Sequence, residues 1–259
     1  MRQIKKLHLK YLYGPVSSFR LGVSVGIDIL SQEEKICTYD CIYCQLGKTK
    51  DYTQERKVYV KENKVVEELK KIPRIHIDYI TFSGSGEPTL AENIGNYIRE
   101  VKKLNIAKIA VITNSSLIKN TKKELIFADL VSLKLDAYSQ ESFEKINRPA
   151  PGIKLDDILE GIFEFKKLYK GILAIQIMFI QENIGFIDEI KRLVFEIKPD
   201  CIQINTPIRK SPTRPLPRDI IIAVKEKFFP ISCVCVYDKR PDTVCFNKKG
   251  TVKRRGLTL

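Results

Sequence analysis

Three cysteines fall within eight residues of this 259-residue chain, at Cys37, Cys41 and Cys44. Thiolates are soft ligands that suit zinc or iron–sulfur clusters. A C-x3-C-x2-C spacing lets one short loop reach three corners of a four-iron cubane and leaves the fourth iron without a cysteine. A structural zinc ion takes four ligands, usually from two separated C-x2-C pairs, and the sequence contains no second such pair. The spacing therefore predicts a [4Fe–4S] cluster, with zinc and a redox-active thiol pair as the alternatives.

A glycine-containing segment at residues 82–90 follows a predicted strand and includes Ser85, Gly86 and Glu87. Glycines just past a strand let the backbone approach a ligand closely, and they can also cradle a phosphate. No Gly-Lys-Ser/Thr follows, so the segment does not predict a nucleoside triphosphate loop. An ordinary turn between two elements is the alternative.

Polar residues also stand at the ends of three further predicted strands. They are Asn114 after the third strand, Lys134 and Asp136 after the fourth, and Asn205 after the sixth. Buried parallel strands are nearly continuous apolar runs, so polar groups at their ends need partners. We expect these four residues to bind a ligand at one rim of the sheet. For Lys134 and Asp136 the alternative is an ion pair with each other or with Arg148.

Apolar strand-like runs alternate with helical periodicity along the chain, which predicts an α/β fold, a partial (β/α)6 TIM-like barrel. The six predicted strands cover residues 21–30, 79–83, 108–113, 130–135, 172–180 and 201–205. Thr121 and Glu124 form a capping-box pattern that predicts a helix start. In such folds the chemistry gathers on the loops after the strands, where the predicted site residues lie.

A Pro- and Arg-rich stretch interrupts this pattern after the sixth strand. It predicts a loop across the barrel mouth, followed by a helix near 218–229 and a strand at 231–237. We therefore expect one domain over 1–259, with a barrel core at about 20–206 and a C-terminal extension at 207–259.

The composition limits the class of protein. Hydrophobic residues make up 44% of the chain, enough for a sizeable core. No long apolar run or secretory signal is evident, so we expect a soluble, cytoplasmic monomer with no membrane partner. The net charge of +14 fits an RNA partner such as tRNA, or the lysine enrichment of a heat-adapted proteome.

The cysteine motif, with Tyr43 before its last cysteine, resembles the defining motif of the radical S-adenosylmethionine (SAM) superfamily. Gly86-Glu87-Pro88 resembles part of that superfamily's Gly-Gly-Glu-Pro motif, with Ser85 in place of the first glycine. The resemblance implies that the three cysteines bind the cluster and that SAM chelates the free iron. It also implies a set of SAM-binding residues, with Tyr43 beside the adenine: Tyr43, Ser85, Gly86, Glu87, Asn114, Lys134, Asp136 and Asn205. No side chain is expected to act as a general base.

Longer segments are similar to the wyosine-synthetase-like branch of the superfamily, over roughly residues 11–218. They are residues 13–16, 20–22, 26–28, 44–47, 84–90, 147–149 and 205–207. Archaeal members of that branch build the tricyclic base of wyosine on tRNA and carry a second cluster on N-terminal cysteines. No cysteine precedes Cys37 in this sequence, which departs from that pattern.

Four more cysteines remain, at Cys201, Cys233, Cys235 and Cys245. An auxiliary cluster is one interpretation, and packing as small hydrophobic side chains is the one we favour.

The resemblance implies an enzyme that cleaves SAM to a 5′-deoxyadenosyl radical, which takes hydrogen from a substrate. A flavodoxin- or ferredoxin-type electron donor is the implied partner, and tRNA or another RNA is the favoured substrate. The alternatives are an activase that makes a glycyl radical on a protein, and a non-catalytic zinc or iron–sulfur module associated with nucleic acid.

Overall fold

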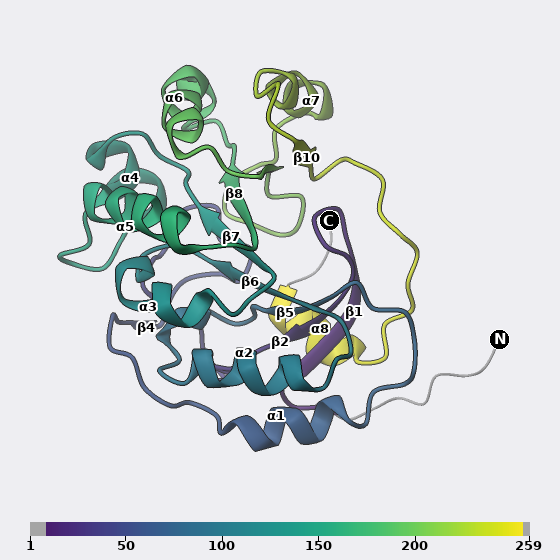
Figure 1. Cartoon of the computed structure of the whole chain (residues 1–259). Coiled ribbons are helices and arrows are strands. Elements are labelled where there is room, and N and C mark those ends of the chain that lie inside the picture. The colour runs from purple at the N-terminus through teal and green to yellow at the C-terminus, as the bar shows by residue number, and fades with distance from the viewer. Residues whose placement is uncertain (1–8, 256–259) are drawn as a thin grey trace.

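A curled eight-stranded sheet forms the centre of the computed structural model, which describes residues 9–255 (Figure 1). Its strands lie in the order β1-β2-β5-β6-β7-β8-β9-β10. Neighbouring strands are parallel except for β1 and β2. The bounds are β1 Leu12–Ser18, β2 Gly22–Ile27, β5 Tyr79–Phe82, β6 Lys108–Thr113, β7 Leu130–Lys134, β8 Ile172–Met178, β9 Cys201–Asn205 and β10 Cys233–Cys235. The sheet does not close on itself, so it has two edges, β1 and β10.

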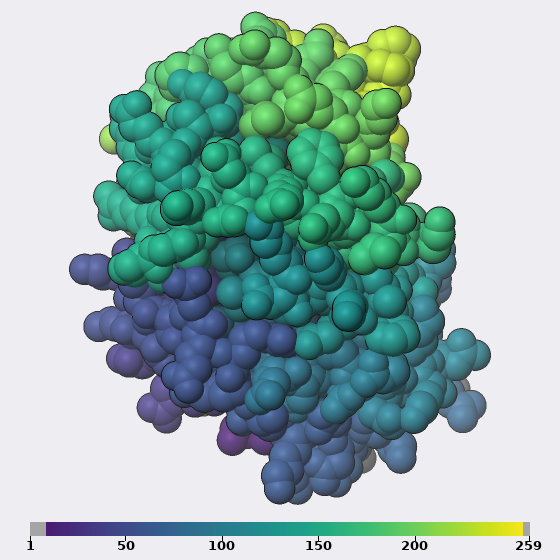
Figure 2. All heavy atoms as spheres, turned by 60° about the vertical axis from the view of Figure 1, so that its left-hand side comes forward, coloured from purple at the N-terminus to yellow at the C-terminus, as the bar shows by residue number. Residues whose placement is uncertain are grey.

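Helices between the parallel strands cover the outer face of the sheet (Figure 1). These helices are α1 Glu62–Leu69, α2 Ile94–Lys103, α3 Ile118–Leu125, α4 Gln140–Asn147, α5 Leu155–Leu168, α6 Ile187–Ile197 and α7 Arg218–Glu226, with short 3-10 turns η1 Pro88–Leu90 and η2 Ile184–Phe186. Helix α8, Lys248–Arg255, follows β10 and packs against β1. Figure 2 shows this face with the segments stacked in chain order, from blue to green. A separate two-stranded sheet pairs β3 Ile36–Cys37 with β4 Asp51–Tyr52. No helix within residues 9–255 is long and apolar enough to cross a membrane.

The six parallel strands from β2 to β9 are the six predicted from the sequence, so the partial barrel is confirmed. Strands β6 and β9 match their predicted bounds. Strand β6 is an apolar run with polar residues at both ends, whereas β9 carries Gln203 at its centre. The predicted β10 and α7 are also present, although both are shorter than expected.

Strand β1 was not predicted, because Gly14 and Pro15 interrupt its sequence. Proline lacks a backbone N–H and is tolerated at a sheet edge, which is where β1 lies. Its register against β2 shifts between Tyr13 and Val16 around these two residues. With β1 and β10 in place, the sheet extends beyond the predicted core of 20–206 at both ends.

The capping box predicted at Thr121 and Glu124 is wrong. Helix α3 already begins at Ile118, so Thr121 lies inside it and its hydroxyl donates to the Leu117 carbonyl at 2.9 Å. Glu124 instead pairs with Arg56. A motif of residue types cannot distinguish a helix start from a helix interior when earlier residues extend the helix.

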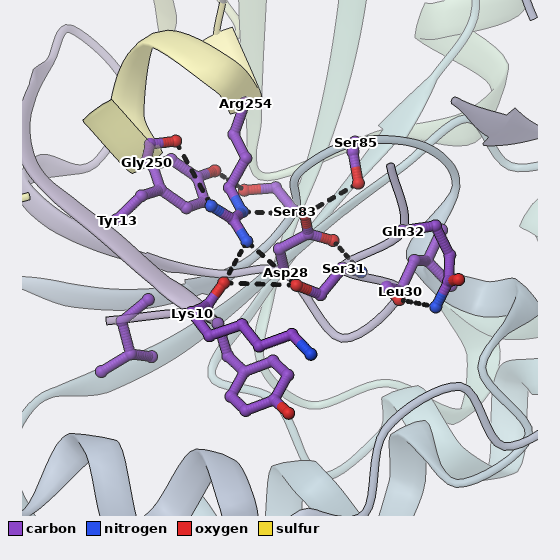
Figure 3. A network of polar contacts seen from close by, with 12 residues as sticks. Lys10, Tyr13, Asp28, Leu30, Ser31, Gln32, Ser83, Ser85, Gly250 and Arg254 are labelled. Atoms are coloured by element: carbon purple, nitrogen blue, oxygen red, sulfur yellow. Dashed lines mark hydrogen bonds and ion pairs between the residues drawn. The ribbon is translucent and has the colours of Figure 1, made fainter. Parts of the chain in front are cut away.

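A buried ion pair fastens the last helix, α8, to the start of the sheet (Figure 3). The Arg254 Nε donates to Asp28 Oδ2 at 2.8 Å, and the two side chains are 3% and 2% exposed. A second Arg254 nitrogen donates to the Lys10 carbonyl and to Ser31 Oγ. Ser85 Oγ also donates to Asp28 Oδ2, at 2.8 Å. Asp28 therefore holds both α8 and the glycine-containing turn after β5.

Replacing Arg254 with methionine is expected to lower the free energy of unfolding by about 3–5 kcal/mol, because Asp28 would remain buried without its cation. The matched control is Lys103→Met, which breaks an exposed pair with Glu100 and is expected to cost less than about 1 kcal/mol. Urea unfolding of both variants measures the difference. Equal losses in the two variants would show that burial does not strengthen the Asp28–Arg254 contact.

Candidate active site

A cavity of about 250 Å³ lies in the mouth of the half-barrel, and most of the predicted site residues line it. The predicted residues that line it are Cys37, Cys41, Tyr43, Cys44, Gly86, Glu87, Asn114, Lys134 and Asn205. Ser85 and Asp136 do not line it. The structure thus brings nine of the predicted residues to one cavity, and Ser85 and Asp136 lie behind its wall.

The three cysteines come from one loop that is held against the end of α4. Cys37 closes β3, and the backbone N–H of Cys44 donates to the Cys41 carbonyl at 3.0 Å. The backbone N–H groups of Asp40 and Ile42 donate to carbonyls of residues 148 and 146, both at 3.0 Å. These contacts explain why the cysteine motif occurs together with Asn147-Arg148-Pro149: the second segment is the surface on which the loop rests.

Burial acts on the acidity of these thiols. It raises the pKa of Cys37 to about 12 and that of Cys41 to about 11. Lys35 and Lys134 oppose the shift at Cys37 and Cys41, respectively. Metal binding requires thiolates, so uptake of iron by this loop releases protons.

Two amide groups point at the cysteine sulfurs. Asn114 Nδ2 lies 3.5 Å from Cys37 Sγ, and Asn147 Nδ2 lies 3.5 Å from Cys41 Sγ. Hydrogen bonds to the sulfurs are one means by which a protein sets the reduction potential of an iron–sulfur cluster. Asn114 was predicted to bind SAM, and this geometry also gives it a contact with the cluster ligands.

The donor set fits a [4Fe–4S] cluster that has one iron without a cysteine. Three thiols line the cavity, and no fourth cysteine of residues 9–255 does so. Within the same residues, no three His, Cys, Asp or Glu side chains converge as the ligands of a single ion do. The three cysteines thus line a cavity that extends beyond them along the ends of the strands.

Glu87 is almost fully buried, and its carboxylate accepts hydrogen bonds from three neighbouring residues. Oε1 accepts from the Thr89 backbone N–H at 3.0 Å and from the hydroxyls of Thr89 and Thr113 at 2.7 and 2.6 Å. Oε2 accepts from the Asn114 backbone N–H at 2.6 Å. Burial raises the pKa of Glu87, although these bonds oppose the shift. Glu87 thus ties the ends of β5 and β6 together at the cavity wall.

Gly86 is required by a close approach to the cysteine loop. A Cβ at this position would lie 1.7 Å from the Ile36 carbonyl oxygen, and the same oxygen accepts from the Glu87 backbone N–H at 3.1 Å. The sequence suggested that this glycine admits a ligand. The contact is instead between two segments of the chain, the residue before Cys37 and the turn after β5.

Asp136 and Ser85, two of the residues predicted to contact SAM, do not line the cavity. Asp136 forms the ion pair given as an alternative, with its Oδ2 3.7 Å from Lys134 Nζ, and does not pair with Arg148. It also accepts from the Tyr43 hydroxyl and, at 2.9 Å, from Asn147 Nδ2. Its carboxylate therefore positions Tyr43, and Lys134 Nζ lies 5.2 Å from the Tyr43 ring centroid. Sequence spacing could not show that Lys134 lines the cavity whereas Asp136 does not.

The cavity contains charged and polar residues that the motifs did not indicate. Lys35 and Gln176 line it, as do four arginines: Arg20, Arg209, Arg254 and Arg255. Burial lowers the pKa of Lys35, but its three cysteine neighbours outweigh that effect and raise it overall. The place of Lys35 two residues before Cys37 was the one available signal.

The remaining cysteines lie outside the cavity lining. Cys235 is fully buried in β10, and Cys245 Sγ donates to the Gly14 carbonyl at 3.1 Å. Cys201 and Cys233 pack partly buried against the core. These positions agree with the packing interpretation.

Comparison with known proteins agrees with the site. The model of the radical SAM superfamily matches residues 35–194. A UPF0026 protein of Synechocystis is 37% identical over 209 residues, covering 78% of this chain and 77% of that protein. A UPF0026 protein of Methanocaldococcus jannaschii is 40% identical over 207 residues, covering 76% of this chain and 63% of that protein. A Brachyspira hyodysenteriae protein named GTPase Obg is 34% identical over 258 residues, which cover 96% of this chain and 37% of that protein.

Solved structures share the fold. TYW1 with a lysine-pyruvate adduct bound matches with a TM-score of 0.61 and 17% identity, covering 81% of this chain and 74% of that one. Streptococcus suis SuiB bound to S-adenosylmethionine matches with a TM-score of 0.63 and 15% identity, covering 83% of this chain and 50% of that one. Family match, fold and cysteine site agree, and the chain therefore belongs to the radical SAM superfamily, whose enzymes use a [4Fe–4S] cluster and S-adenosylmethionine.

Proposed function

We propose that this chain cleaves SAM reductively and uses the resulting 5′-deoxyadenosyl radical to abstract hydrogen from an RNA substrate. Reductive cleavage of SAM is supported by the set of three thiols in the cavity, because no fourth cysteine within residues 9–255 lines it. The bound cluster supplies the electron that breaks the C5′–S bond of SAM, leaving methionine and the radical. A flavodoxin- or ferredoxin-type partner is the proposed source of that electron.

The chain's own residues bind and orient SAM. Tyr43 is held in the wall by Asp136 and offers its ring to the adenine. Gly86, Glu87 and Asn114 form a rigid wall beside the cysteines, and Lys134 and Asn205 offer polar groups from the ends of β7 and β9. Rigid placement matters because hydrogen abstraction requires the reacting atoms to be near each other before the bond breaks.

RNA as the substrate is supported by charge and by resemblance. The chain carries a net charge of +14, and arginines lie inside the cavity as well as on the surface. Basic residues that reach an active site attract a polyanion to the place where it reacts. The segments shared with the wyosine-synthetase-like branch, which modifies tRNA, point the same way.

The test measures 5′-deoxyadenosine released by anaerobically reconstituted, dithionite-reduced protein. We expect release that rises about tenfold when total RNA is added, which corresponds to an activation free energy lower by roughly 1.4 kcal/mol. RNA digested to nucleosides is the control. Equal release with intact and digested RNA would contradict an RNA substrate, and no release under any condition would contradict SAM cleavage itself.

A further inference from the structure

Four arginines meet where the two edges of the open sheet approach each other. Arg20 lies in the turn between β1 and β2, Arg209 follows β9, Arg240 follows β10, and Arg255 ends α8. All four line a second cavity of about 390 Å³. We call them the arginine cluster.

This second cavity adjoins the SAM site. Arg20, Arg209 and Arg255 line both cavities, as do Gln45 and Asn205. Gln45 directly follows Cys44, and its Oε1 accepts from the Arg209 backbone N–H at 3.0 Å and from Arg209 Nε at 2.9 Å. Arg209, one member of the arginine cluster, is therefore positioned by the residue that follows the cysteine loop.

No acidic side chain neutralises the arginine cluster within the described part of the chain. No Asp or Glu lines the second cavity, and none of the four arginines takes part in an ion pair among residues 9–255. Burial, together with repulsion from Arg255 and Arg209, lowers the pKa of Arg20 to about 9. Burial and the charge of Arg255 lower the pKa of Arg209 to about 10. Such a group of like charges is unfavourable until an anion enters.

The arginines keep donors free for that anion. Each guanidinium carries five N–H groups. Arg20 donates to Gln176 Oε1, but its buried Nε has no hydrogen-bond partner among the described residues. Phe19 lies between two members, with its ring centroid 5.2 Å from Arg20 Cζ and 5.8 Å from Arg240 Cζ. The ring helps to hold these two side chains in place without neutralising them.

We propose that the arginine cluster binds a phosphate group of the substrate and thereby sets which hydrogen faces the SAM site. The proposal rests on the proposed function, because it concerns the substrate of the adjoining cavity. Guanidinium groups match phosphate oxygens in pairs, and several converging arginines suit a group with several charged oxygens better than a carboxylate with two. The phosphate is either a phosphodiester of RNA or the phosphate monoester of a nucleotide.

The test uses the reconstituted protein and three probes: inorganic phosphate, 5′-AMP and the dinucleotide ApA. Calorimetry at constant ionic strength measures each dissociation constant. In Arg20→Gln/Arg255→Gln we expect binding of 5′-AMP or ApA to weaken roughly a hundredfold, as two charge-assisted hydrogen-bonding contacts are lost. The matched control, Arg74→Gln/Arg99→Gln, removes the same charge from exposed positions on the helical side and is expected to bind as the parent does.

Thermal unfolding shows whether a loss of binding in the double variant is caused by a destabilised fold. Because the double variant relieves repulsion, we expect its melting temperature without phosphate to equal or exceed that of the parent. Phosphate should raise the melting temperature of the parent and the control but not of the variant. ApA binding supports an RNA phosphodiester, and binding of 5′-AMP alone supports a nucleotide monoester. The proposal is overturned if none of the three probes binds, or if they bind the double variant as tightly as the parent. Release of 5′-deoxyadenosine without added RNA is measured separately and reports on SAM cleavage alone.

Discussion

Cys41→Ala is expected to reduce the iron content of reconstituted protein from about four atoms per chain to near zero. Three thiols serve the cluster in the cavity, so the loss of one leaves two irons without a protein ligand instead of one. Release of 5′-deoxyadenosine should fall to the level seen without protein. Cys41 is only partly buried, so the fold should survive the change.

Cys245→Ala is the matched control for this prediction. Its thiol lies outside the cavity lining and donates to the Gly14 carbonyl, a contact worth about 1 kcal/mol. Iron and SAM cleavage should both be retained. Full iron content in Cys41→Ala, or its loss in Cys245→Ala, would contradict the assignment of the three-cysteine loop.

Gly86→Ala is expected to lower SAM cleavage by about a hundredfold, the cost of misplacing a reacting group by about 1 Å. The new Cβ would lie 1.7 Å from the Ile36 carbonyl oxygen and 2.8 Å from its carbon. Both atoms are backbone, so neither can rotate away as a side chain could. Relief requires the turn at Glu87 or the strand that carries Cys37 to move, and either shift alters the cavity wall.

Gly185→Ala provides the comparison, because nothing lies within 4 Å of a Cβ built at this residue and its φ is not in the left-handed region. We expect unchanged activity and at most about 1 kcal/mol of change in the free energy of unfolding. Denaturant unfolding together with 5′-deoxyadenosine release separates the two variants. Normal activity in Gly86→Ala would show that the two segments can separate without disturbing the cysteines.

Local patterns predicted the fold and the cluster site well. The cysteine loop is contiguous in sequence, and β6 is an apolar run with clear ends. Strand β1 was not predicted because Gly14 and Pro15 are uncommon within strands, although proline is tolerated in an edge strand such as β1. The strand-end residues were correctly expected at one rim, since parallel strands end together, but their side-chain directions were not available from spacing.

The arginine cluster could not be predicted from spacing at all. Arg20 and Arg255 are brought together only because the sheet curls and α8 packs against β1. The position of an arginine on a loop or at a helix end does not show which distant residues line the same cavity. For Asp136, spacing placed the residue at the rim but could not show that its carboxylate contacts Tyr43, Asn147 and Lys134.

The pair that fastens α8 joins residues 226 positions apart. During synthesis the cysteine loop and the first parallel strands leave the ribosome long before Arg254 does, and domains begin to assemble from their N-terminal parts. Until that last helix arrives, Asp28 lacks its cation and the wall that Arg254 and Arg255 contribute is missing. A chain synthesised only as far as β10 therefore carries the cysteine loop but lacks the two arginines that α8 adds to the cavity wall.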